Sequence, residues 1–141
     1  MDSLFQVHAL MNTIAKSSSI EAILQQRILV MDGAMGTMIQ AQALSEKDFR
    51  GEKFQDHRID LKGNNEILNL TRPDVIKSIH TDFLISGADI IATNTFTANS
   101  VSQGDFGTEE WVYELNYQAT KLARQAIAEL PSEQHCQPRF V

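Results

Sequence analysis

Residues 28–37 read ILVMDGAMGT, an apolar run followed directly by an acid and a glycine-containing loop. The four apolar residues 28–31 have the length and composition of a β-strand buried on both faces, as in parallel sheets. Asp32 and Gly33 then fall at the carboxyl end of that strand. Ligands bind at the carboxyl ends of strands in open parallel sheets and in barrels alike, so this stretch predicts a ligand-binding position at Asp32.

The composition indicates a globular cytoplasmic domain. Its 141 residues are 43% hydrophobic and carry a formal net charge of −6, with scattered basic residues that argue against a nucleic-acid partner. No apolar run approaches the ~18 residues that a membrane span needs, and the N-terminus lacks the features of a secretory signal. Cys136 is the single cysteine, so an intrachain disulfide is excluded.

The first part of the chain carries helical patterns on both sides of the opening stretch. Apolar spacing within residues 4–14 predicts a helix, and a capping box of Ser18 and Glu21 predicts a second helix at 19–26. Residues 36–44 can form a further short helix after the Asp-Gly loop.

The second part has clearer helices after a stretch without a period. Residues 45–70 are polar and interrupted by glycines, as in a long functional loop. Thr71 is expected to cap a helix that Gly87 ends. A long amphipathic helix is expected at 109–130, with one apolar face.

Two further strands are expected. Asp89–Thr93 forms the second and leads into Asn94 and Thr95, and residues 139–141 begin a third. Strands that alternate with helices predict right-handed crossovers and a parallel sheet, which leaves a barrel and a doubly wound sheet both open. Because two and a half such units cannot close an eight-stranded barrel, we expect the chain to be a fragment.

The strand ends offer the residue types that bind an amino acid. Asp32 can take an ammonium group, while backbone amides near Gly33 can approach and bind a carboxylate. Asn94 and Thr95 are expected to face the same mouth. The alternative is that both strand ends are ordinary turns satisfied by their own hydrogen bonds. The spacing of a dinucleotide fingerprint and that of a phosphate loop are both absent.

The histidines and the cysteine, which are the usual ligands of zinc, do not occur at the sequence spacings typical of metal sites. The histidines lie far apart in sequence, and Cys136 has no neighbouring Cys or His partner, so we interpret it as incidental. His80 is expected to be a surface or packing residue. The four histidines are His8, His57, His80 and His135.

Five stretches in register resemble cobalamin-dependent methionine synthases, in their N-terminal homocysteine-binding module of the homocysteine S-methyltransferase family. The resemblance runs from about residue 26 to residue 141. The matching stretches are Ile28–Gln40 (ILVMDGAMGTMIQ), Phe49–Phe54 (FRGEKF), Asp60–Ile76 (DLKGNNEILNLTRPDVI), Gly87–Phe96 (GADIIATNTF), and the pattern of Asn116 followed by Lys121–Arg124.

The resemblance implies an α/β fold, a partial (β/α)8 TIM barrel with an N-terminal helical extension over residues 1–26 and the barrel fragment at 27–141. It implies a methyltransferase that makes methionine by transferring a methyl group from methylcobalamin to the zinc-activated thiolate of homocysteine. A separate folate module of the parent would remethylate the cobalamin from 5-methyltetrahydrofolate.

The resemblance also implies roles for individual residues. Asp32 and the amides of Gly33, Ala34 and Met35 would hold the amino-acid end of homocysteine, and Asn94 and Thr95 would line the same mouth. Three cysteine thiolates would bind zinc, all beyond Val141, so no catalytic or metal-binding residue is expected in this chain. We expect the chain alone to be inactive and to bind neither zinc nor cobalamin. Many relatives have an acidic residue where this chain has Ala92.

Two other interpretations remain. One is a cobalamin-independent homocysteine S-methyltransferase that uses betaine or S-methylmethionine, which would lack folate and cobalamin modules. The other is a non-catalytic fragment that binds an amino acid at its strand ends without metal chemistry.

Overall fold

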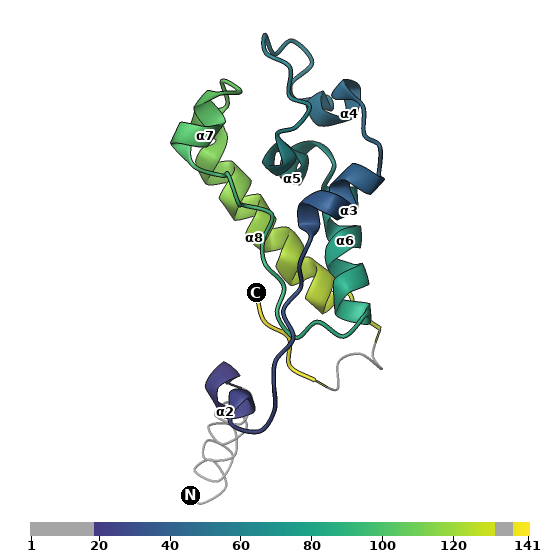
Figure 1. Ribbon diagram of the computed structural model, residues 1–141. Coiled ribbons are helices and arrows are strands. Elements are labelled where there is room, and N and C mark those ends of the chain that lie inside the picture. Colours follow the sequence, from purple (N-terminus) through teal and green to yellow (C-terminus); the bar gives the residue numbers. More distant parts are fainter. Residues whose placement is uncertain (1–18, 132–136) are drawn as a thin grey trace, which may run out of the picture.

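Helices dominate the computed structural model of the protein, which describes residues 19–131 and 137–141 (Figure 1). The helix expected within residues 4–14 lies outside the described residues. In chain order, the described α-helices and 3-10 turns (η) are α2 (Ile20–Leu24), α3 (Met35–Ala41), α4 (Glu46–Arg50), η1 (Asn65–Ile67), α5 (Leu68–Thr71), α6 (Pro73–Ile85), α7 (Ser100–Gly104), η2 (Glu109–Trp111) and α8 (Val112–Ala128).

Three extended segments run between these helices and pair in parallel. Single parallel bridges join Met31 to Ile90 and Ile90 to Phe140, so the segment around Ile90 is the central one. The backbone N–H of Asp32 donates to the carbonyl of Ile90 at 2.9 Å, and that of Ile91 donates to Phe140 at 2.9 Å. The predicted parallel order is confirmed. Regular strands are not formed, because each pairing in the described part of the chain is an isolated bridge.

The prediction that residues 28–31 are buried on both faces is wrong. Ile28 is 86% exposed and Val30 is 55% exposed. Side chains of an extended segment project from its faces, so these exposures mean that the described residues do not cover the faces of this segment. The apolar run thus predicted the extended backbone of this segment correctly, but it did not predict whether the side chains are buried.

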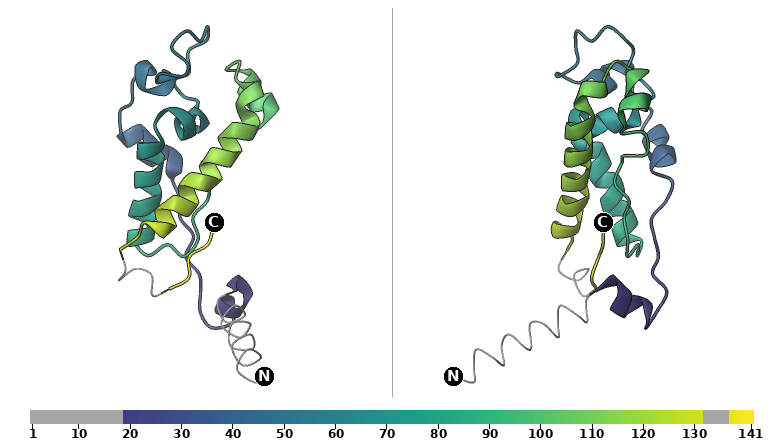
Figure 2. Two further views of the ribbon diagram at one scale, coloured as in Figure 1. Left: turned by 180° about the vertical axis from the view of Figure 1, so that it is seen from behind. Right: turned by 90° about the vertical axis from the view of Figure 1, so that its left-hand side faces the viewer.

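Helices α6 and α8 pack side by side and supply nine of the 20 buried apolar residues in the described part of the chain (Figures 1 and 2). On α6 the buried face includes Ile76 and Ile79, as the apolar spacing predicts. The end of α6 is also as predicted. Gly87 has a φ of +107°, and Ala88 N–H donates to the carbonyl of Phe83 at 3.0 Å, which is a left-handed glycine cap.

Helix α8 presents the apolar face that the sequence predicts. It is preceded by the tight turn η2 rather than starting directly as an α-helix at residue 109. The buried members of the predicted apolar face are Leu115, Ala119, Leu122, Ala126 and Leu130.

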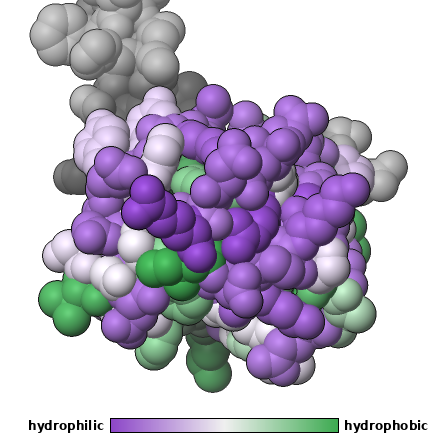
Figure 3. All heavy atoms as spheres, turned by 90° about the horizontal axis from the view of Figure 1, so that it is seen from above, coloured by the Kyte–Doolittle hydropathy of each residue, from purple (hydrophilic) through white to green (hydrophobic). Residues whose placement is uncertain are grey.

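The surface at the end near α4 and α7 is mostly polar. Hydrophilic side chains cover most of it, and apolar side chains form small separate spots (Figure 3).

Several helix starts differ from the predictions. Ser19 caps α2, since its hydroxyl accepts from Ala22 N–H at 3.2 Å, whereas the sequence predicts a cap at Ser18, which lies outside the described residues. Thr71 does not cap α6: it ends α5, and its hydroxyl donates to the carbonyl of Ile67 at 3.3 Å. Arg72 takes the capping position instead.

The stretch at residues 45–70, which the sequence suggested was a long loop, is helical in part: it contains α4, η1 and most of α5, and residues 51–64 between them are turns and irregular backbone. Helix α4 begins with a reciprocal capping box, in which Ser45 N–H donates to the Asp48 carboxylate at 2.8 Å. The elements are too short to show a period, so the pattern of apolar residues could not reveal them.

Asp89 joins the three extended segments at their amino ends. Arg27 donates two hydrogen bonds to its carboxylate, at 2.6 and 2.8 Å, and Val30 N–H donates at 2.9 Å. Arg139 approaches to 3.6 Å from the third segment. The Arg27 guanidinium lowers the pKa of the buried Asp89 carboxyl to about 2. The buried, charged carboxylate therefore links distant parts of the chain through hydrogen bonds and ion pairs.

His80 is buried in the core of α6. Neither ring nitrogen has a hydrogen-bond partner among the described residues, and burial lowers the pKa of the ring to about 4. The sequence predicted that His80 is either a surface or a packing residue, and the second of these roles is confirmed. Its neutral ring packs as an apolar group.

We expect Arg27→Ala to destabilise the protein at neutral pH. The substitution removes two charged hydrogen bonds from a buried carboxylate, which keeps only Val30 N–H and the more distant Arg139. Because Asp89 has a lowered folded pKa, its contribution is complete above the unfolded pKa of ~3.9 and is lost as pH falls toward 2. Urea unfolding of wild type and variant should therefore differ at pH 7 and converge on acidification. The exposed Arg58→Ala is the control, and equal stabilities at pH 7 would contradict this role.

We expect His80→Leu to remove a pH dependence of stability. In the unfolded wild-type chain His80 binds a proton below about pH 6.5, whereas in the folded protein the ring binds one only near pH 4. The free energy of unfolding of wild type therefore falls by about 3 kcal/mol as the pH is lowered across this window. Leucine has a similar volume and no nitrogen to protonate. The variant should be as stable as wild type at pH 7 and more stable at pH 4.5 in urea titrations. Parallel pH profiles would show that His80 does not carry the effect.

Candidate functional site

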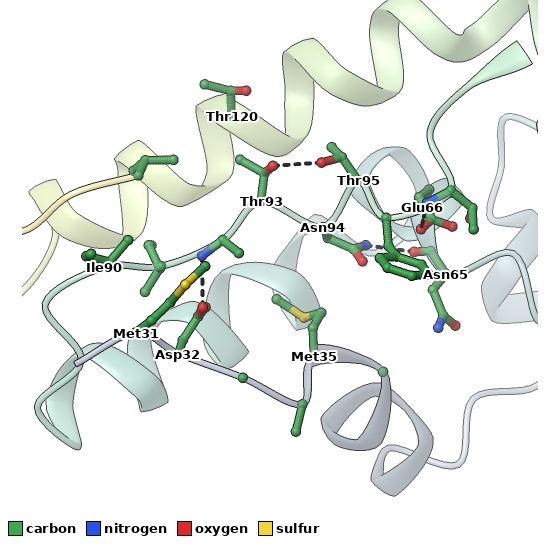
Figure 4. Close-up of a pocket in the computed structure, with 18 of the residues that line it drawn as sticks. Met31, Asp32, Met35, Asn65, Glu66, Ile90, Thr93, Asn94, Thr95 and Thr120 are labelled. Atoms are coloured by element: carbon green, nitrogen blue, oxygen red, sulfur yellow. Dashed lines mark hydrogen bonds between the residues drawn. The ribbon is translucent and has the colours of Figure 1, made fainter. Parts of the chain in front are cut away.

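A pocket opens at the carboxyl ends of the first two extended segments (Figure 4). Its volume is about 890 Å³, which suits a small organic ligand. Both stretches that the sequence singled out contribute to it, one from each segment. The predicted residues that line this single pocket are Asp32, Gly33, Ala34, Met35, Asn94 and Thr95.

Asp32 lies between the two segments with part of its carboxylate engaged. Its Oδ1 accepts a hydrogen bond from Ala92 N–H at 2.9 Å, a bond drawn in Figure 4. Burial raises the pKa of Asp32, and the bond from Ala92 opposes that rise. The second carboxylate oxygen accepts no hydrogen bond from the described residues. Asp32 therefore fixes the segment pairing and still offers an oxygen to a ligand.

The loop that follows Asp32 exposes backbone to the pocket. No atom lies within 4 Å of the position that a Cβ on Gly33 would occupy, so a ligand can approach the backbone there. Ala34 has a φ of +41°, a left-handed conformation that alanine rarely adopts. It is also the N-cap of α3 and makes no side-chain cap. Strain of this kind in a pocket loop is typical of functional sites.

Asn94 is more deeply engaged than the sequence indicates. Its buried side-chain amide donates to the carbonyl of Asn65 at 2.8 Å and to Asn69 Oδ1 at 3.1 Å. The side chain of Asn69 returns a hydrogen bond to the carbonyl of Asn94 at 2.8 Å. The hydroxyls of Thr93 and Thr95 pair with each other at 2.8 Å. Only the bond between the two threonines is local, as the ordinary-turn interpretation predicts, whereas the bonds of Asn94 join residues 25 or more positions apart in sequence. Asn94 and Thr95 therefore mainly shape the pocket wall.

Sequence reasoning missed Glu66. It is buried in the pocket wall, where its Oε1 accepts from Thr97 N–H at 2.9 Å. Its only signal was its place in an Asn-Asn-Glu cluster before an apolar run. With Asp32 it gives the pocket two carboxylates, while no Lys, Arg or His lines it in the described part of the chain. The pocket therefore favours a ligand with a positively charged group, such as the ammonium of an amino acid.

The described residues offer no metal site. They contain no group of three or more His, Cys, Asp or Glu side chains that could hold an ion. His57 is hydrogen-bonded to the carbonyl of Phe106 at 2.7 Å, away from the pocket. Cys136, His8 and His135 lie outside the described residues.

Within the described ranges, no helix is long and apolar enough to cross a membrane.

Comparisons with known proteins identify similar sequences and folds. The family model described as "Homocysteine S-methyltransferase" matches residues 29–141. Two crystal structures of the homocysteine methyltransferase MmuM from Escherichia coli have similar folds. The oxidized form has a TM-score of 0.60 at 24% identity, covering 80% of this chain and 36% of that one. The metallated form has a TM-score of 0.60 at 21% identity, covering 85% and 38%. The chain thus spans less than two fifths of their length.

We expect Ala34→Gly to stabilise the protein by up to about 1 kcal/mol. Glycine relieves the left-handed strain of 1–2 kcal/mol, less the entropy that it adds to the unfolded chain. Ala43 has a φ of +50° outside this pocket and should respond in the same way to Ala43→Gly. Ala41→Gly at the end of helix α3 should destabilise. Urea unfolding measures all three, and a destabilising Ala34→Gly would contradict strain in the loop.

Proposed function

Because this chain belongs to the homocysteine S-methyltransferase family, we propose that its pocket holds the amino-acid end of homocysteine. One arrangement carries the proposal: a carboxylate with an uncommitted oxygen stands beside exposed backbone in the same pocket. Asp32 provides the carboxylate and the loop beginning at Gly33 provides the backbone.

In this proposal the two charged ends of the amino acid have different partners. Asp32 binds the ammonium group, and the absence of cationic side chains among the described lining residues leaves it to amides to bind the carboxylate. The amides of Gly33, Ala34 and Met35 take that role. Asn94 and Thr95 form the facing wall and limit the width of the pocket.

We place the chain in a larger methyltransferase of the cobalamin-dependent methionine synthase branch. The support is the series of five stretches in register, with FRGEKF and LKGNNEILNLTRPDVI closest to that branch. The parallel extended segments and their crossover helices are then part of a (β/α)8 barrel. The branch also predicts that folate- and cobalamin-binding modules follow in the parent gene.

Zinc, cobalamin and 5-methyltetrahydrofolate belong to this proposal only through other parts of the parent. The described residues provide no ligand set for a metal, so zinc does not fit them. The contribution of this chain is to bind and orient the amino-acid end of the substrate.

Titration of the full ¹⁵N-labelled chain with L-homocysteine tests the proposal. We expect amide shifts at Gly33, Ala34 and Met35, and an affinity at least about tenfold lower in Asp32→Asn, because a charged hydrogen bond is lost. Asparagine keeps an oxygen for Ala92 N–H, so thermal stability should stay close to wild type. Acidification should weaken binding at a higher pH than for an ordinary aspartate, because the pKa of Asp32 is raised.

Two controls make the result specific. Asp56→Asn removes an exposed carboxylate outside the pocket and should leave affinity unchanged. A ligand without the ammonium group, 4-mercaptobutanoic acid, should bind wild type and Asp32→Asn equally. Absence of homocysteine binding to wild type would overturn the proposal. Tight binding that requires zinc would show that the metal ligands are in this chain after all.

A further inference from the structure

One face of α8 carries two tyrosines that are exposed among the described residues. Tyr113 is 78% exposed and Tyr117 is 54% exposed. Their rings stack, with centroids 6.3 Å apart and an interplanar angle of 9°. Two exposed and mutually ordered aromatic rings on one helix are typical of an interaction surface, where aromatic side chains supply contact area at low entropic cost.

Charged residues extend this face in both directions. Lys121 and Arg124 follow the tyrosines at helical spacing, are exposed, and form no ion pair with the described residues. Glu110 lies in the tight turn η2, three residues before Tyr113 of α8, and it is likewise exposed and unpaired within the described ranges. A shallow groove along the face is lined by Tyr117, Thr120, Lys121, Arg124, Gln125 and Ala128.

The order of these residues is symmetric about Tyr117. Glu110 and Arg124 are each seven residues from Tyr117, Arg124 after two turns of α8 and Glu110 before it, in the turn η2 that leads into α8. Tyr113 and Lys121 are each four residues from it. A second α8 placed antiparallel across a two-fold axis at Tyr117 therefore brings Glu110 of one copy to Arg124 of the other, and Tyr113 to Lys121. The first pair is an ion pair and the second a cation–π contact.

We propose that this face of α8 binds a second copy of the same chain in an antiparallel, two-fold arrangement. An acidic or basic partner would complement only one half of the face, whereas a second copy complements both halves at once. One helix face buries less than the 1,200–2,000 Å² of a standard interface, so the dimer is weak and micromolar. The surface adjoins the Asp32 pocket at Thr120, which lines both, but the proposal does not depend on the proposed function.

Sedimentation equilibrium of the full chain across a concentration series tests the proposal. Wild type should be monomeric at low micromolar concentration and dimeric at high concentration. Glu110→Arg and Arg124→Glu, made singly, each place like charges together twice per dimer and should weaken association at least tenfold. The double variant Glu110→Arg/Arg124→Glu reverses both partners and should restore it.

Matched variants control for net charge. Glu52→Arg and Arg58→Glu make the same charge changes at exposed positions off this face and should leave the equilibrium unchanged. Circular dichroism melts confirm that each variant is folded. A monomer at all concentrations, a dimer insensitive to the two single reversals, or a double variant as weak as the singles would each overturn the proposal.

Discussion

The buried carboxylate of Asp89 is the joint on which the arrangement of this chain depends. It binds Arg27 and the backbone of Val30 from the first extended segment, and Arg139 approaches it from the third. Two isolated bridges alone would fix the register weakly, since so few hydrogen bonds are formed. A shared ionic partner at the amino ends supplies the missing constraint. The carboxyl ends then meet in a fixed register, which brings Asp32 to the amide of Ala92.

Much of the helical framework could be predicted because it rests on local chemistry. The faces of α6 and α8 follow from apolar spacing, and the cap at Gly87 follows from its freedom to adopt positive φ. The exposure of residues 28–31 could not be predicted from the sequence. Whether an apolar segment is buried depends on what covers it and not on its own composition. The role of Asp89 was missed for the same reason: its partners are fifty or more residues away in sequence.

The candidate site was predictable only where it follows the rule of strand ends. Asp32, its loop and Thr95 come directly after extended segments, and the structure places them around one pocket. Glu66 comes from a stretch without periodicity that buried polar bonds hold in place. Among them, Asn64 donates to Gln103 at 2.9 Å, and Thr108 donates to Gln103 at 2.7 Å. Such side-chain networks leave no periodic trace in sequence.

The parallel bridges also determine the order in which this molecule can fold. They join residues fifty or more positions apart, with a crossover helix in each interval, whereas α6 and α8 form from neighbours in sequence. Distant contacts carry a larger loop-closure entropy and form more slowly than local ones. Helices should therefore appear before the segments pair, and Asp32 should meet Ala92 among the last events. The end of the fold that carries the Asp32 pocket is then the last part of the described chain to become ordered on the folding pathway.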